Sequence, residues 1–252
     1  MLFRKIIFSA LLIGIISGLL FSAVQFIGVS PIIFAAEQYE VAEPEVETVP
    51  DHHHGEAASS AHHHDAEAWG PEDGLERSLY TLLSYVLAGI GFAAVLLAIM
   101  SQLQLNGVTR LSVVKGLAWG VAGFIAFFAA PGIGLPPEIP GIEAAPLEYR
   151  QSWWMLAVVA SGIGIGVLAF AKGFFKAAGL LLIAIPYLIG APHPAGPEFT
   201  HPDANAVAIL SDLHQQFIIA SGVSNLIFWL ALGALCAWAL NRQVLDSEHA
   251  QA

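Results

Sequence analysis

Residues Ile6–Val29 read IIFSALLIGIISGLLFSAVQFIGV and determine the fold class of this chain. About 24 consecutive residues of this kind are the length that crosses a bilayer as an α-helix. Arg4 and Lys5 precede the run, as basic residues do in a signal peptide. The apolar core of a signal peptide holds only about 7–15 residues. We therefore expect this segment to be a retained membrane-spanning helix.

The rest of the chain repeats this pattern. Hydrophobic residues make up 56% of the 252 residues and charged residues only 12%, which is too apolar for a soluble domain. No ten-residue alternation indicates a membrane barrel. We predict an all-α integral membrane protein, a single polytopic domain over residues 1–252, from six apolar segments: Ile6–Val29, Leu79–Leu103, Leu111–Ala130, Trp153–Ala171, Ala177–Gly190 and Leu213–Leu240.

The fifth segment leaves the number of spans open. It is short and contains Pro186, so it is either a kinked span or a re-entrant segment, and five spans are the alternative to six. The distribution of basic residues favours six spans with a cytoplasmic N-terminus. In that topology only Arg77 and Arg150 lie outside, and the others lie inside: Arg4, Lys5, Arg110, Lys115, Lys172, Lys176 and Arg242.

The same topology makes the outer face acidic. Of the 20 acidic residues, all except Asp246 and Glu248 fall on the outside. Such a face raises the local concentration of cations. The absence of a basic patch argues against nucleic acid as a partner.

Small residues predict where helices touch. Glycines four residues apart allow two helix backbones to approach closely in a membrane. Adjacent tryptophans at a helix end are typical of the membrane interface. We expect an interfacial anchor at Trp153 and Trp154 and close helix packing at three glycine pairs: Gly14 and Gly18, Gly116 and Gly120, and Gly162 and Gly166.

Two histidine triplets lie in the first outer loop, in the stretch DHHHGEAASSAHHHD from Asp51 to Asp65. Imidazole and carboxylate are ligands for divalent metals such as cobalt, nickel and zinc. We expect residues 37–77 to form a disordered periplasmic loop that captures a divalent cation. The alternative is a solvated loop that binds metals only incidentally. The predicted ligands are His52, His53, His54, His62, His63 and His64.

A second group of polar residues precedes and enters the last apolar segment. Ionisable residues at membrane depth are costly and indicate a functional site. The alternative for Asp212 is a helix N-terminus at the interface, where the carboxylate complements the helix dipole. From a region that also holds Glu198 and Asp203, we select four candidate metal ligands: His193, His201, Asp212 and His214, the last of which needs a partner from another segment, such as His193.

Motifs of catalysis are missing from the sequence. It contains no phosphate-binding G-x-x-x-x-G-K-[ST] and no His-Glu-x-x-His, and no nucleophile stands beside an orienting base. We therefore expect no enzyme activity and no cofactor.

Several stretches resemble the CbtA family of cobalt transporter subunits. They are MLFRKIIFSALLIGIISGLL (1–20), WGPEDGLERSLYTLL (69–83), GLAWGVAGFIAFFAAPGIGLPPEIPG (116–141), RQSWW (150–154) and PHPAGP (192–197). The resemblance implies cobalt uptake linked to cobalamin synthesis. It also implies a small single-span, histidine-bearing partner, CbtB. The family is described with five spans, whereas the charges here favour six.

We therefore expect a protein of the bacterial inner membrane that imports Co²⁺. One alternative is an accessory subunit that buffers metal and delivers it to another permease. A nickel or zinc transporter would use the same ligands. A haem-binding membrane oxidoreductase would need two histidines deep in facing helices, and only His214 lies near a span.

Overall fold

The computed structural model describes residues 2–39 and 70–249 of the chain. Within these residues every regular element is a helix, and the only β-type pairing is an isolated antiparallel bridge between Ile142 and Phe199. The predicted all-α membrane fold is confirmed, because five of the helices are long and apolar enough to cross a bilayer.

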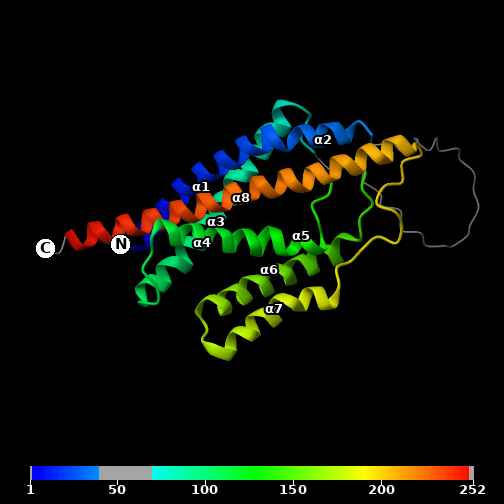
Figure 1. The fold of residues 1–252 in the computed structure, drawn as a ribbon. Coiled ribbons are helices and arrows are strands. Elements are labelled where there is room, and N and C mark those ends of the chain that lie inside the picture. Colours follow the sequence, from blue (N-terminus) through cyan, green and yellow to red (C-terminus); the bar gives the residue numbers. More distant parts are fainter. Residues whose placement is uncertain (1, 40–69, 250–252) are drawn as a thin grey trace, which may run out of the picture.

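Four helices form the main bundle (Figure 1). Helix α1 packs against α3 and α8, and α4 packs along α8. Phe21 of α1 lies 5.0 Å from Phe228 of α8, measured between ring centroids, and Leu97 of α3 and Leu232 of α8 are fully buried beside them. The four helices are α1 (Leu2–Gly28), α3 (Leu75–Leu105), α4 (Val113–Phe124) and α8 (Ala204–His249).

A helical hairpin lies beside this bundle. It consists of α6 (Leu147–Phe170), a 3-10 turn η2 (Gly173–Phe175) and α7 (Lys176–Ile189). The prediction that Trp153 is an interfacial anchor is wrong. Its side chain is only 5% exposed, and its Nε1 donates a hydrogen bond of 3.0 Å to the Pro186 carbonyl oxygen of α7. This tryptophan therefore joins the two helices of the hairpin.

The hairpin contacts the bundle through the end of the third apolar segment. Helix α4 continues as a π-helix, η1 (Ile125–Ala129), and then as α5 (Ala130–Gly134), and both of these pack against α6. Pro131 of α5 has no N–H to donate, and the wider π turn directly precedes it.

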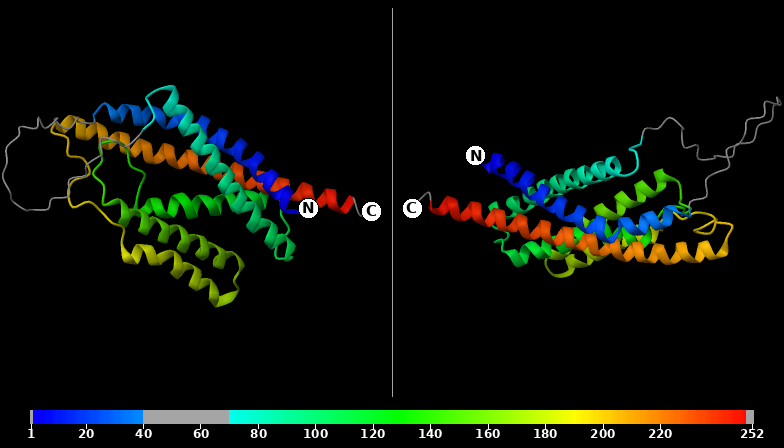
Figure 2. Two further views of the ribbon diagram at one scale, coloured as in Figure 1. Left: turned by 180° about the vertical axis from the view of Figure 1, so that it is seen from behind. Right: turned by 90° about the horizontal axis from the view of Figure 1, so that it is seen from above.

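The described helices run back and forth between the two ends of the molecule (Figures 1 and 2). The N- and C-termini lie at the same end, and α7 returns the chain from the end of α6 towards the start of α8 (Figures 1 and 2). Five of these helices are of spanning length, whereas α7 has 14 residues. A 14-residue helix rises about 21 Å, which is less than the roughly 30 Å of a hydrocarbon core. The fifth predicted segment is thus a short helix.

Charge distinguishes the two ends. We call the end that holds the chain termini the basic end and the opposite end the acidic end. In the described part of the chain, acidic side chains with a defined placement gather at the acidic end, where α2, α3, α6 and α8 have their outer turns. The basic end carries the residues predicted to face inward: Arg4, Lys5, Arg110, Lys115, Lys172, Lys176 and Arg242.

Two of the three predicted glycine pairs lie at close helix contacts. A Cβ added at Gly14 would lie 2.3 Å from the Ile90 Cα of α3. One added at Gly120 would lie 2.4 Å from the Trp229 carbonyl oxygen of α8. The third expectation is wrong, because a Cβ at Gly162 or Gly166 would meet no atom within 4 Å.

Two helical segments at the acidic end extend beyond the predicted apolar runs. Helix α8 begins at Ala204, because Asp203 caps it: the Asn205 backbone N–H donates to the Asp203 Oδ1 at 2.9 Å. After Gly28 the chain forms a further helix, α2 (Ser30–Glu37), whose first turn contains Pro31. These extensions carry the side chains of the candidate site.

Candidate functional site at the acidic end

The predicted histidine loop begins and ends at the acidic end. Residues 40–69, which include His52–His54 and His62–His64, lie outside the described residues. The loop was predicted over residues 37–77, but helices extend into this range at both sides. Helix α2 includes Glu37, and helix α3 begins at Leu75. The chain therefore leaves and re-enters the bundle at the same end as the two proline-rich loops (Figure 1).

An ion pair joins the two borders of this segment. Arg77 of α3 donates to Glu37 of α2 at 2.5 Å and to Asp73 at 3.2 Å. Its guanidinium also lies 5.5 Å from the centre of the Phe34 ring. Glu37 and Arg77 are 40 positions apart in the sequence, so this contact closes the loop at its base.

The loops after α5 and after α7 form a cap over this end. Ile142 and Phe199 make the isolated bridge, and the Glu143 backbone N–H donates to the Glu198 carbonyl oxygen at 2.7 Å. Phe199 is 6% exposed and packs in a small core with Ala36 of α2 and Leu210 of α8. The cap is therefore fixed to both helices that extend beyond the apolar runs.

His214 lies beneath this cap and is only 4% exposed. Its Nε2 is 3.0 Å from the Pro137 carbonyl oxygen. A carbonyl oxygen can only accept, so Nε2 carries the proton and donates. The other ring nitrogen, Nδ1, lies 3.9 Å from Oε2 of Glu198. His214 therefore binds the first cap loop through its Nε2. Its Nδ1 faces the Glu198 carboxylate of the second cap loop.

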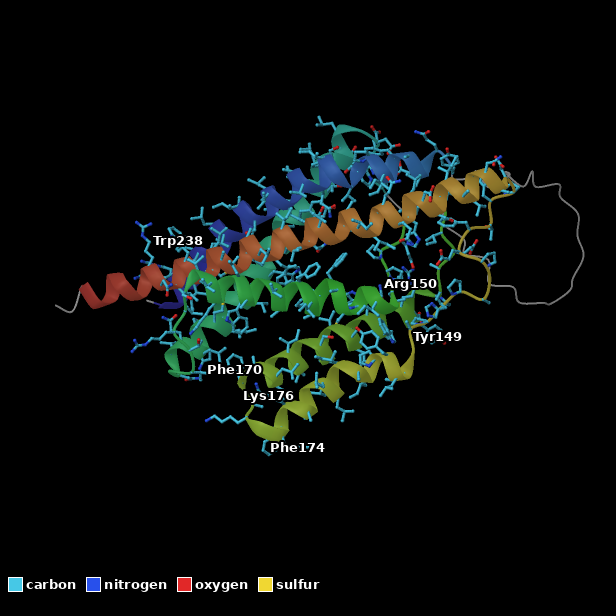
Figure 3. The ribbon with its side chains drawn as sticks, viewed as in Figure 1. Tyr149, Arg150, Phe170, Phe174, Lys176 and Trp238 are labelled. Carbon is cyan, nitrogen blue, oxygen red and sulfur yellow. The ribbon has the colours of Figure 1, made fainter. Side chains whose placement is uncertain are left out.

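The His214 and Glu198 pair could supply two ligands to one divalent ion. Metal–imidazole and metal–carboxylate bonds are each about 2.0–2.2 Å long, so two neighbouring ligand atoms of a tetrahedral or octahedral ion lie about 3.0–3.4 Å apart. The 3.9 Å between Nδ1 and Oε2 is longer than this, and because the Glu198 side chain is 67% exposed, a change of its rotamer can close the difference. Glu138, one residue beyond Pro137, forms an ion pair with Arg150 of α6, which is labelled in Figure 3, and is not free to join them.

The other predicted ligands do not join His214 in a common site. His193 and Asp212 are exposed. His201 accepts a 3.0 Å hydrogen bond at Nδ1 from the Asp203 backbone N–H and so belongs to the turn before α8. Over residues 2–39 and 70–249, no group of three or more His, Cys, Asp or Glu side chains could hold a metal ion. A site with more protein ligands than the pair would need the residues outside the described part or a residue of another protein.

Sequence reasoning selected His214 but not Glu198. Nothing in the surrounding Pro-rich stretch separates Glu198 from the other loop acids. Its position beside His214 depends on the bridge between Ile142 and Phe199, a pairing of two distant loops. The predicted partner of His214 was His193, whereas the observed ones are Pro137 and Glu198.

Replacing His214 with alanine should destabilise the protein by about 1–3 kcal/mol, because the variant leaves the Pro137 carbonyl without its donor and opens a cavity under the cap. Thermal unfolding of the purified protein in detergent measures this loss. His193→Ala is the matched control, since it removes an exposed imidazole from the same loop region. Equal melting shifts in the two variants would contradict this role of His214.

Comparison with known proteins identifies the family. The family described as "Probable cobalt transporter subunit (CbtA)" matches residues 3–241, nearly the whole chain. No curated protein and no solved structure matches this chain. The match confirms the resemblance found in the sequence, and a transporter subunit with several apolar helices is a multi-pass membrane protein. The chain belongs to the CbtA family.

Proposed function

We propose that this protein imports Co²⁺ across the bacterial inner membrane, as a subunit of a transporter that supplies cobalamin synthesis. Membership of the CbtA family carries the proposal. The charge pattern supports its direction, because a basic end is typical of the cytoplasmic side. The acidic end, with the borders of the histidine segment, then faces the periplasm.

In this proposal the acidic end collects the ion and the histidines bind it. Clustered carboxylates raise the local concentration of cations and the rate of capture. The six histidines at 52–54 and 62–64 supply imidazole, which suits cobalt as well as nickel and zinc. Selection between these metals therefore needs a more constrained site than the loop.

From the histidines the ion would move to the pair formed by His214 and Glu198. His214 is buried and held by Pro137, so its free nitrogen has a fixed position beside Glu198. The His214 imidazole gives the ion one ligand of defined position, whereas the Glu198 side chain is 67% exposed. A ligand of defined position discriminates between ions by geometry better than a set of loop ligands does. The remaining ligands would come from water, from the histidine segment or from a partner subunit such as a single-span CbtB-like protein.

The membrane potential supplies the driving force. Moving one charge through 100 mV is worth about 2.3 kcal/mol, and a divalent ion gains roughly twice that. Inward movement of Co²⁺ needs no nucleotide hydrolysis, which agrees with the absence of a phosphate-binding motif from the sequence.

Metal accumulation in cells tests the proposal. Cells expressing the chain with its partner should accumulate more cobalt than cells with an empty vector, and the double variant His214→Ala, Glu198→Ala should reduce the gain. Nickel and zinc measured in the same cells give the selectivity. Purified protein in liposomes that passes no metal, with or without the partner, would overturn the permease role.

A second candidate function is an accessory subunit that binds metal and delivers it to another permease. The observation in its favour is that the described helices hold no group of three metal-ligating side chains along the bundle. In that case the path through the membrane belongs to another protein. Deletion of the histidine segment distinguishes the two functions, as argued in the Discussion.

A further inference from the structure

A groove lies between the main bundle and the hairpin, near the basic end. It is bounded by α3, by α4 with η1, and by α6, and its volume is about 640 Å³. Its walls are apolar except for Thr109 and Lys115. Trp119 of α4 and Phe170 of α6 face each other across its basic end, with ring centroids 6.4 Å apart.

The glycines of α6 leave the groove open. Gly162 and Gly166 line it, and a Cβ at either would meet no atom within 4 Å. Gly164 faces the other way and packs against α7, where an added Cβ would lie 2.7 Å from the Gly179 carbonyl oxygen. The side of α6 that faces the bundle thus lacks the side chains that would close the gap.

The groove has the depth of one leaflet. Its α4 wall runs from Lys115 to Phe127, a rise of about 18 Å along a helix. Half of a hydrocarbon core is about 15 Å. Beyond Phe127 the space ends, because η1 and α5 pack against α6. A membrane-spanning helix from another protein could not lie in it along its full length, whereas an acyl chain of one leaflet ends at that depth.

The mouth of the groove is positively charged. The Lys115 ammonium donates to the Thr109 Oγ1 at 3.1 Å and to the Arg110 carbonyl oxygen at 2.6 Å, and it makes no ion pair with a described carboxylate. An ammonium has three N–H donors, so one is left for a ligand. Arg110 lies on the same side, and Lys172 follows the end of α6 on the other.

We propose that this groove binds one anionic phospholipid from the leaflet at the basic end, with an acyl chain between α4 and α6 and the phosphate at Lys115. Basic residues at the ends of helices on the cytoplasmic side attract anionic headgroups. The apolar walls, the single-leaflet depth and the remaining N–H donor of the Lys115 ammonium at the mouth all match this one ligand. The lipid would fill the space between the hairpin and the bundle.

Retention of lipid by the purified protein tests the site. The full chain is reconstituted in bilayers of equal parts phosphatidylglycerol and phosphatidylcholine and extracted in mild detergent. Native mass spectrometry then measures the fraction of protein that carries a bound lipid and the mass of that lipid. The wild type should retain one phosphatidylglycerol. Lys115→Gln should lower the retained fraction about fivefold, the value of one basic residue near a headgroup. The control Lys176→Gln, at the same end but outside the groove, should leave it unchanged.

A second pair of variants tests the groove itself. Gly166→Leu places a side chain in the open space and should abolish retention of the lipid. Gly91→Leu is its control, because Gly91 also has no atom within 4 Å of an added Cβ but does not line the groove. Equal melting temperatures of the two variants show that both are folded.

Three outcomes would overturn the proposal. One is equal retention of lipid by wild type and Gly166→Leu. Another is equal retention of phosphatidylcholine and phosphatidylglycerol, since the site then does not select an anionic headgroup. The third is a co-purified single-span protein that Gly166→Leu releases while bound lipid is unaffected. None of these results depends on which ion the protein moves, so the test is independent of the proposed function.

Discussion

Gly120→Leu should unfold the bundle or lower its melting temperature by roughly 10 °C. A Cβ at this position would lie 2.4 Å from the Trp229 carbonyl oxygen and 2.9 Å from the Leu230 Cα. Both obstructing atoms belong to the backbone of α8, so no rotamer change can relieve the clash. Gly233 of α8 faces the same contact, with the Gly120 nitrogen 2.6 Å from its added Cβ. Helix α4 would have to move away from α8 along its length.

Size-exclusion chromatography with a fluorescent fusion, after heating, measures this effect. Gly91→Leu controls for the general cost of leucine in a membrane helix, because it adds the same atoms where no neighbour lies within 4 Å. We expect the control to melt within a few degrees of wild type, as surface substitutions do. A Gly120→Leu protein as stable as the control would show that α4 and α8 do not pack as described.

Deleting Glu47–Glu67 should raise the external cobalt needed for half-maximal accumulation by about tenfold, in line with the usual gain from electrostatic focusing. The deletion removes all six histidines and five acidic residues and leaves Glu37 and Arg77 in place. At saturating cobalt the accumulation should approach that of wild type, because in the proposed function the loop supplies ions but does not form the path. Metal accumulation across a range of external concentrations gives both values.

The accessory function predicts a different result for the same deletion. A subunit that only buffers and delivers metal would lose its effect at every cobalt concentration. A variant with asparagine at 52–54 and 62–64 separates the roles of imidazole and carboxylate, since it keeps the acids and the loop length. Imidazole binds metal only when neutral and has an ordinary pKa of about 6.5. The advantage of the wild-type loop over this variant should therefore shrink as the external pH falls below that value.

Hydropathy predicted the spans well and their ends poorly. The apolar runs located every helix of spanning length, because an apolar segment in the hydrocarbon core must satisfy its backbone hydrogen bonds internally, as a helix does. The start of α8 lay nine residues earlier than the run from Leu213, since a cap at Asp203 and burial of Leu210 under the loops extend the helix into the polar region. The π-helix before Pro131 has no signal in hydropathy, which reports burial but not hydrogen-bond register.

The glycine pairs show what spacing can and cannot predict. The pattern at 14 and 18 and the one at 162 and 166 look alike in the sequence, yet only the first contacts a helix. Which face of α6 meets a neighbour depends on how the hairpin is attached to the bundle, through η1 and α5. That attachment is a tertiary contact and leaves no local pattern. Glu198 was missed for the same reason, because a pairing of two loops brings it to His214.

Because the ion pair between Glu37 and Arg77 joins the two borders of the histidine segment, the length of this segment can change with little effect on stability. The side chains at the two borders are in contact, with 2.5 Å between the Arg77 Nη2 and the Glu37 Oε1, whatever lies between them in the sequence. A flexible insertion that doubled the number of residues would cost only about 0.6 kcal/mol of closure entropy. Histidines could thus be added or lost one at a time without disturbing the helices. Under the proposed function, the affinity for scarce metal could change in this way while the membrane-spanning helices stay the same.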